Sequence, residues 1–159
     1  MEIRDAVAED AAAACQVLRQ SIEQLCEADH RNDPVILARW LSNKTAANVA
    51  AWIARPDNSL LLAVEVNRIL AVGAVTDAGE ITLNYVAPNA RFRSASRILL
   101  AALEARAAQR GNLRCNLFST ETAHRFYRAR GYVDDGPPDR KYGMAGGYPM
   151  SKALAAQKA

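Results

Sequence analysis

The sequence predicts one mixed α/β domain over residues 1–159. Apolar residues recur at helical spacing in the first third, and β-rich runs begin at Ser59. From there, strand and helix patterns alternate to the end of the chain. No internal repeat or low-complexity linker divides the sequence, and its length is enough for one hydrophobic core.

Helices account for most of the first third. Residues 2–4 are expected to form a short strand, and an apolar stripe over about residues 9–27 predicts an amphipathic helix. The pair Asp33-Pro34 predicts a helix start, because the aspartate can accept from unpaired amides and the proline needs no N–H there. Thr45 caps the next expected helix, over residues 46–53.

Three antiparallel strands are expected next. Residues 60–66 and 69–76 are β-rich runs joined by a short Asn67-Arg68 connection, which predicts a hairpin. The turn 77–79 leads into a third strand that begins at Glu80. These strands form the first half of the predicted sheet.

The second half alternates helices and strands. A helix after Ser94 is expected to end at Gly111, followed by a strand over residues 113–118. This strand must pair parallel to the Glu80 strand through a right-handed crossover. Thr120 caps another helix that ends at Gly131, and residues 132–133 and 148–152 supply the closing strands.

The turn between the Glu80 strand and the next helix is the clearest candidate site. Pro88 ends regular strand pairing, and Arg91, Arg93 and Arg97 precede or open the helix. The first amides of a helix are unpaired and carry partial positive charge, so small side chains there allow phosphate groups to bind. The turn therefore predicts an anion-binding site.

Composition narrows the partners. The formal net charge is +3 and the arginines of the turn are clustered, which favours a compact anionic ligand over a nucleic acid. Neither a membrane span nor a signal peptide is apparent, so we expect a cytoplasmic protein with no membrane partner. The 3 cysteines include no Cys-x-x-Cys pair, which predicts buried reduced thiols and no metal site.

Two motifs, in order, resemble the GNAT superfamily of N-acetyltransferases. The segment Arg91-Phe92-Arg93-Ser94-Ala95-Ser96 follows Val86-Ala87-Pro88 in the frame of the family's Arg/Gln-x-x-Gly-x-Gly/Ala motif, with serine at both glycine positions. The segment 126–132, FYRARGY, is similar to the family's Phe-Tyr-x-x-x-Gly-Phe/Tyr helix end. The resemblance covers nearly the whole chain and implies a mostly antiparallel twisted sheet with one splayed parallel strand pair, flanked by helices.

The resemblance implies acetyl-CoA as cosubstrate, without a metal. The pantetheine arm would lie between the splayed strands, with the pyrophosphate on the turn and Tyr127 protonating the departing thiolate. The residues expected to bind the cofactor on this basis are Asn84, Tyr85, Val86, Arg91, Phe92, Arg93, Ser94, Ala95, Ser96, Arg97, Thr120 and Tyr127. Serine is costly at these positions if the backbone has positive φ, and nearly neutral if it is already helical.

The sequence does not identify the residue that acts as general base. Glu80 is the nearest acidic candidate, with a solvated turn carboxylate as the alternative, and His30 is a candidate substrate-binding residue, with a surface loop histidine as the alternative. Cys115 lacks a neighbouring histidine in the sequence and is not expected to act as a nucleophile. Four aromatic residues are candidates for the acceptor pocket or for packing: Trp40, Trp52, Tyr142 and Tyr148.

The expected activity is transfer of an acetyl group to a primary amine, of a small molecule or a peptide, by direct attack in a ternary complex. Two alternatives remain from the sequence: a non-catalytic acyl-CoA-binding or sensory module, and an interaction protein that keeps only the fold. A homodimer is an expectation from the family.

Overall fold

The computed structural model describes residues 1–91, 94–140 and 146–155. Its helices and strands follow one another along the chain as β1 (Glu2–Asp5), η1 (Ala8–Asp10), α1 (Ala11–Leu25), α2 (Glu27–His30), α3 (Pro34–Leu41), α4 (Ala46–Ala54), β2 (Asn58–Glu65), β3 (Arg68–Thr76), β4 (Ile81–Val86), η2 (Pro88–Ala90), α5 (Ala95–Gln109), β5 (Arg114–Ser119), α6 (His124–Ala129), β6 (Val133–Asp134) and β7 (Tyr148–Ala153). No helix within these ranges is both long and apolar enough to cross a membrane.

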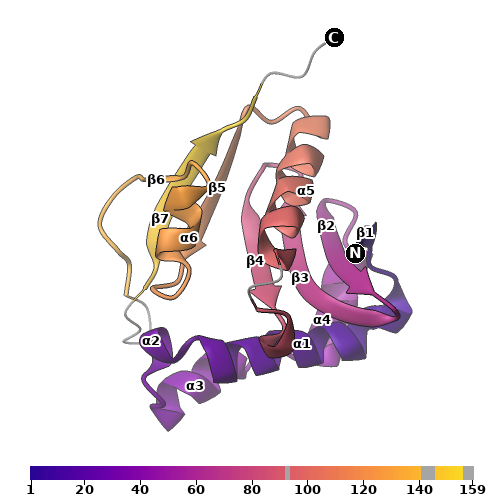
Figure 1. Ribbon diagram of the computed structural model, residues 1–159, viewed down its shortest axis with the longest axis vertical. Coiled ribbons are helices and arrows are strands. Elements are labelled where there is room, and N and C mark those ends of the chain that lie inside the picture. The colour runs from indigo at the N-terminus through magenta and orange to yellow at the C-terminus, as the bar shows by residue number, and fades with distance from the viewer. Residues whose placement is uncertain (92–93, 141–145, 156–159) are drawn as a thin grey trace.

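The strands form two sheets that open away from each other like a V (Figure 1). One is 4-stranded, in the order β1-β2-β3-β4, and the other is 3-stranded, in the order β5-β7-β6. At the apex, Glu80 and Asn116 form a parallel bridge, and the Asn116 N–H donates to the Gly79 carbonyl at 3.0 Å. Beyond it β4 and β5 diverge, which confirms the predicted splayed parallel pair.

Helices cover both faces of the larger sheet. The helix α5 packs on β2, β3 and β4 from one side, while α1 and α4 pack from the other (Figure 1). Gly73 lets α5 approach closely, since a Cβ at that position would lie 2.8 Å from Leu103 Cδ1. The helix α1 crosses the open end of the V and contacts β4 and η2.

A polar cluster ties the smaller sheet to α5. The Glu104 carboxylate accepts from the Tyr132 hydroxyl at 2.7 Å and from Lys152 Nζ at 3.0 Å. Because Glu104 lies on α5 and Lys152 on β7, these bonds fix the distance between the two arms of the V.

Two of the predicted caps are confirmed, whereas Thr120 lies before the turn that precedes α6 and does not cap that helix, whose N-cap is Ala123. Asp33 accepts from the N–H groups of Val35 and Ile36 at the start of α3, and Thr45 accepts from Asn48 N at 3.1 Å at the start of α4. Past the ends of α5 and α6, Gly111 and Gly131 have φ of +90° and +98°. These are left-handed conformations that glycine adopts without a Cβ penalty.

Some local predictions were wrong. The hairpin between β2 and β3 turns at Val66 and Asn67, with φ of 48° and 61°, one residue before the expected Asn67-Arg68 pair. The register of the strands fixes this turn, because Glu65 pairs with Arg68. The short helix α2 was also missed, and β7 lies between β5 and β6, an order that the sequence did not predict.

Candidate active site between the splayed strands

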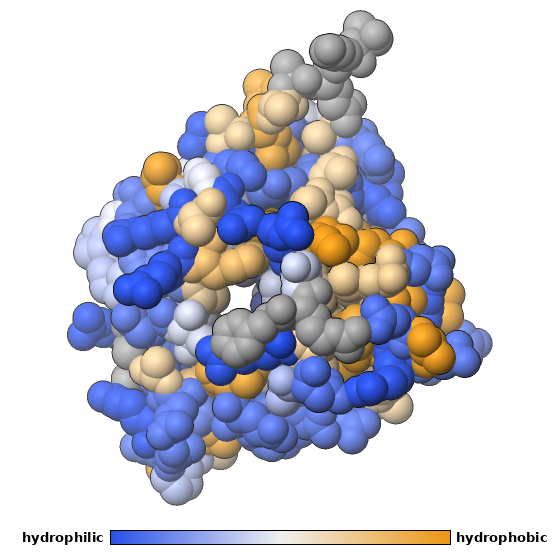
Figure 2. All heavy atoms as spheres, in the orientation of Figure 1, coloured by the Kyte–Doolittle hydropathy of each residue, from blue (hydrophilic) through white to orange (hydrophobic). Residues whose placement is uncertain are grey.

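The divergence of β4 and β5 creates a cavity of about 520 Å³. A hollow is visible between the two halves of the molecule in Figure 2. This volume is within the range of small-molecule and cofactor sites. The lining residues come from the end of α1, from β4, from the turn and first residues of α5, and from β5 and α6. They include Ser21, Cys26, Asn84, Tyr85, Arg91, Ser94, Ser96, Arg97, Phe118, Thr120, Thr122, Tyr127 and Arg130.

One edge of β4 faces the cavity with backbone groups. The Ala87 N–H donates to the Leu70 carbonyl at 2.8 Å, and the pairing with β3 is regular from Val86 back to Asn84. Successive N–H groups of a strand point to opposite edges, so those of Asn84 and Val86 point toward β5. The Tyr85 N–H points into the ladder instead. Of the backbone groups expected to bind the cofactor, those of Asn84 and Val86 are therefore available and that of Tyr85 is not.

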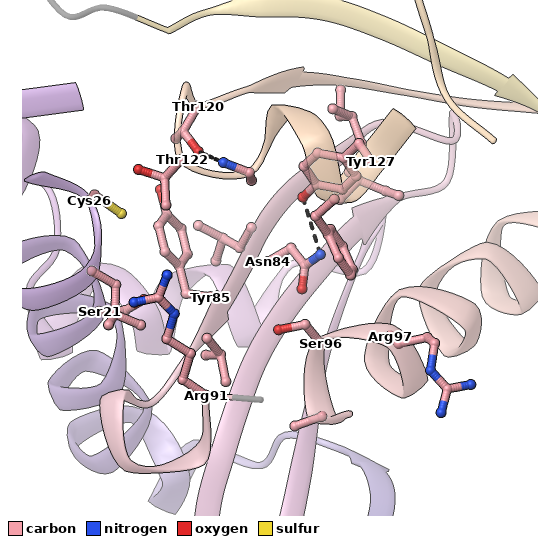
Figure 3. Close-up of a pocket in the computed structure, with 18 of the residues that line it drawn as sticks. Ser21, Cys26, Asn84, Tyr85, Arg91, Ser96, Arg97, Thr120, Thr122 and Tyr127 are labelled. Atoms are coloured by element: carbon pink, nitrogen blue, oxygen red, sulfur yellow. Dashed lines mark hydrogen bonds between the residues drawn. The ribbon is translucent and has the colours of Figure 1, made fainter. Parts of the chain in front are cut away.

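The predicted anion-binding turn borders the same cavity. Ser94 precedes α5 with φ of 65°, a left-handed conformation, whereas Ser96 lies in the right-handed first turn of the helix. The Ser96 hydroxyl points into the cavity and the Arg97 guanidinium points away from it (Figure 3). Ala95 lines the cavity too, while Phe92 and Arg93 lie outside the described residues. The serine substitutions thus differ in cost, because one of them requires positive φ.

Replacing Ser94 with glycine should stabilise the protein by roughly 0.5–1 kcal/mol, because glycine removes the strain of a Cβ at positive φ. Ser96→Gly is the matched control, and it should destabilise by about 0.5 kcal/mol because its position is already helical. Urea unfolding of the three proteins measures both effects. Equal changes in the two variants would contradict the assignment of strain to Ser94.

Tyr127 and Asn84 form a hydrogen-bonded pair in the wall of the cavity. The Asn84 side-chain Nδ2 donates to the Tyr127 hydroxyl oxygen at 3.1 Å (Figure 3). The Tyr127 ring is held edge-on between Phe126 and Tyr132, at centroid distances of 5.3 Å and 5.5 Å. Since the phenol oxygen accepts from Asn84, its own O–H is left to donate to another group. Burial raises the pKa of Tyr127 to about 12, so the phenol keeps its proton at neutral pH.

Asn84 also presents an unsatisfied acceptor. Its Oδ1 atom is buried and has no hydrogen-bond partner among the described residues. An unpaired buried acceptor costs about 1–3 kcal/mol, so this oxygen is a destabilising feature of the cavity wall.

Asp29, which sequence reasoning missed, lies behind the cavity wall and holds Thr122, one of the lining residues. It is 1% exposed and accepts from three donors: Glu121 N at 2.6 Å, Thr122 N at 3.1 Å and Thr122 Oγ1 at 2.6 Å. These bonds join α2 to the turn that opens α6. Thr120 begins that turn by accepting from Ala123 N at 3.1 Å (Figure 3). Asp29 therefore helps to place α6, and with it Tyr127, relative to the N-terminal helices.

Glu80 lies outside the main cavity. It is exposed at the apex of the V and lines a separate cavity of about 380 Å³, together with Asn116, Phe118 and Asp135. The parallel bridge at Glu80 holds β4 and β5 together there, so its side chain is placed at the closed end of the V. We therefore do not propose Glu80 as the general base.

His30 is an internal structural residue, contrary to both sequence interpretations. Its side chain is 0% exposed, Nδ1 accepts from Asn32 N at 3.0 Å, and Nε2 lies 2.8 Å from the Ile22 carbonyl. An acceptor Nδ1 requires the proton on Nε2, which donates to that carbonyl. Both ring nitrogens are thus bound inside the protein, and we do not propose His30 as a substrate contact.

The remaining candidates have packing roles. Burial raises the pKa of the Cys115 thiol to about 11, which agrees with an inert cysteine. The Trp40 indole hydrogen-bonds to Tyr85, Trp52 packs against the core, and Tyr148 stacks on His124 at 3.7 Å while donating to Glu121. Tyr142 lies outside the described residues.

Two splayed parallel strands above a helix-opening turn form the arrangement that the resemblance predicted for an acyltransferase domain. The family model for the acetyltransferase (GNAT) domain matches residues 16–154. The chain therefore belongs to the GNAT acetyltransferase family.

Solved structures share this fold. A GCN5-related N-acetyltransferase from Rhodopseudomonas palustris is 26% identical, with a TM-score of 0.85 over 96% of this chain and 95% of the other. PaiA N-acetyltransferase from Thermoplasma acidophilum, solved with coenzyme A, is 18% identical, with a TM-score of 0.82 over 96% and 98% of the two chains. The YncA protein from Salmonella typhimurium, solved with its cofactor acetyl-CoA, is 19% identical, with a TM-score of 0.74 over 100% of this chain and 96% of the other. A search of curated proteins found no match.

Proposed function

We propose that the protein transfers the acetyl group of acetyl-CoA to an amine by direct attack in a ternary complex. The observation that carries the proposal is the Asn84–Tyr127 pair in the wall of a cavity between β4 and β5. It sets a protonated phenol in the gap where the resemblance expects the thioester. The structures of the Thermoplasma and Salmonella proteins, which contain coenzyme A or acetyl-CoA, support the choice of cosubstrate.

The described residues fit coenzyme A in three respects. The N–H groups of Asn84 and Val86 point to the open edge of β4, as a strand-like pantetheine arm requires. The Ser94 turn presents the start of α5 to the cavity, where a pyrophosphate would accept from unpaired amides. The Ser96 hydroxyl is directed into the cavity, where it can donate to phosphate (Figure 3).

Each residue then has a chemical task. An open-edge N–H of β4 would donate to the thioester oxygen as negative charge develops on it, a contribution of about 3 kcal/mol in acyl transfer. The Tyr127 O–H would donate its proton to the departing sulfur while Asn84 holds the phenol oxygen in place. The Phe126 and Tyr132 rings restrict the phenol to this orientation.

A titration with acetyl-CoA followed by thiol release tests the proposal. The melting temperature should rise with acetyl-CoA, because a ligand at 100 times its dissociation constant stabilises by about 2.7 kcal/mol. Coenzyme A release should then depend on an added amine. A thermal shift without thiol release across a broad amine panel would instead support a non-catalytic acyl-CoA-binding module, and no shift would support a protein that retains the fold alone.

A further inference from the structure

The ionisable side chains that line the main cavity are neutral or positively charged at neutral pH. They are Cys26, Tyr85, Arg91, Arg97, Tyr127 and Arg130. Burial raises the pKa of Cys26 and of Tyr127 to about 12 each, and it raises the pKa of Tyr85 as well, so these three side chains keep their protons. The charge that faces the cavity is therefore carried by the guanidinium groups of Arg91 and Arg130, since that of Arg97 points away from the cavity.

Arg91 brings this charge to the side of the cavity nearest α1. Its guanidinium lies beside Ser21 and below the ring of Tyr85, on the side opposite Ser96 (Figure 3). Arg130, at the end of α6, has a buried Nε atom with no hydrogen-bond partner among the described residues. Positive charge thus comes from two sides of the cavity, the turn before α5 and the end of α6.

The carboxylates and imidazoles discussed above are engaged elsewhere. Glu80 opens onto the second cavity, Asp29 is occupied by three donors, and His30 uses both ring nitrogens internally. The residues outside the described ranges include no Asp, Glu or His. Within the described chain, the cavity wall therefore presents neither a counter-ion for an ammonium group nor a carboxylate or imidazole to deprotonate one.

Such a wall selects among amines by their basicity. Positive charge near an ammonium group lowers its pKa and favours the neutral amine, which is the nucleophilic form. At pH 7.4 about 0.1% of an alkylamine with a pKa of 10.4 is neutral, compared with about 30% of a peptide α-amine with a pKa near 7.8. The two classes differ by about 300-fold in reactive form before any contact with the protein is considered.

We propose that the acceptor is a weakly basic amine, the α-amino group of a peptide, which enters the cavity in its neutral form; this inference rests on the acetyl transfer proposed above. Because Asn84 Nδ2 holds the phenol of Tyr127 at 3.1 Å, the acid is already in place when the neutral amine attacks. After attack the amine loses one proton to solvent, and Tyr127, which gave its proton to the departing sulfur, takes one back from solvent.

A matched pair of peptides tests this inference. One peptide has a free α-amine and no lysine, and the other has the same sequence with an acetylated α-amine and one lysine. The kcat/KM of the α-amine peptide should exceed that of the lysine peptide by at least 100-fold at pH 7.4. Its pH profile should rise with the pKa of the peptide's own amine, and the rise should move to lower pH for an amine of lower pKa.

Variants test whether the positive charge of the cavity wall affects the ratio of kcat/KM for the two peptides. Arg91→Gln should widen the preference for the α-amine peptide, because the loss of a positive charge raises the pKa of a lysine ammonium in the cavity and lowers its neutral fraction most. A ratio of two acceptors cancels any change in acetyl-CoA affinity. Arg125→Gln, which removes an exposed arginine of α6 outside the cavity, should leave the ratio unchanged. Glu80→Gln should leave the pH profile of the α-amine peptide unchanged.

Several outcomes would overturn the inference. One is a lysine peptide or simple alkylamine that is acetylated as well as the α-amine peptide at pH 7.4. Another is a pH profile whose rise stays at the same pH for amines of different pKa, because that would indicate a base on the enzyme. A rise in rate that disappears in Glu80→Gln would indicate the same. Turnover with alkylamines alone would overturn the acceptor class and leave acetyl transfer standing, whereas no turnover with any amine despite acetyl-CoA binding would overturn both.

Discussion

Replacing Tyr127 with phenylalanine is expected to lower kcat by about 100-fold or more, since a positioned acid contributes roughly 10²–10⁴-fold to such a step. The ring keeps its contacts with Phe126 and Tyr132, so acetyl-CoA affinity should stay within about threefold of the wild-type value. Steady-state kinetics and an acetyl-CoA titration measure the two quantities. The loss of one hydroxyl leaves Asn84 Nδ2 unpaired, so the melting temperature is measured alongside.

Tyr148→Phe provides the matched control. It removes the same atom from a tyrosine outside the cavity, whose hydroxyl donates to Glu121 at 2.6 Å, and it should leave kcat within about twofold. A Tyr127→Phe enzyme with wild-type turnover would remove the assigned acid.

The pH dependence of the acid follows from its environment. The pKa of Tyr127 is raised by burial to about 12, above the value near 10 of an exposed tyrosine, so the folded protein keeps this proton when the unfolded chain begins to lose it. Its contribution to stability is complete below about pH 10 and declines as the pH rises toward 12. Over the usual assay range the phenol therefore stays protonated, and kcat should show no fall from its ionisation below about pH 10.

Replacing Asp29 with asparagine should lower the free energy of unfolding by about 3 kcal/mol. The asparagine has the same shape, but it turns an NH₂ group toward backbone donors that the carboxylate satisfied, and a buried donor without an acceptor costs about 1–3 kcal/mol. The loss of charge also weakens bonds that are worth about 1.5–3 kcal/mol each. Chemical denaturation measures the change.

Asp33→Asn is the control for Asp29→Asn. Asp33 also accepts from backbone amides, at 2.9 Å and 3.3 Å, but it is exposed, and asparagine is an equivalent helix cap. Its stability should change by only a few tenths of a kcal/mol. Equal effects of the two substitutions would show that Asp29 is not a buried anchor.

Activity gives a second measurement for Asp29. Because Asp29 joins α2 to the turn that opens α6, Asp29→Asn should lower kcat even at a temperature where the variant is fully folded. If the folded Asp29→Asn protein had an unchanged kcat, the role of Asp29 would be limited to folding.

Local patterns in the sequence predicted the elements because each pattern has a local physical cause. Asp33-Pro34 and Thr45 mark helix starts, since a side-chain oxygen three residues or fewer from unpaired amides can cap them in any fold. Alternation of apolar residues identified the strands, and the motif frame identified Tyr127 and the turn. These signals depend on neighbours in the chain, and the structure confirmed the elements to within a few residues.

Local patterns did not predict contacts between residues that are far apart in the sequence. Asp29 lies 92 residues before Glu121, whose N–H it accepts, and nothing around either residue predicts the bond. The exclusion of Glu80 and His30 from the main cavity likewise depends on where β5 and the N-terminal helices pack.

By itself, the sequence determined the class of fold, and it predicted an anion-binding turn and a candidate acid, since these follow from spacing along the chain. The tertiary structure alone decided that Ser94 holds a left-handed conformation while Ser96 is helical, that Asn84 positions the phenol of Tyr127, and that the cavity wall carries guanidinium charge. Backbone angles at a turn and the charge around a cavity depend on how α1, β4, α5 and α6 pack together, and that packing is set by the whole core.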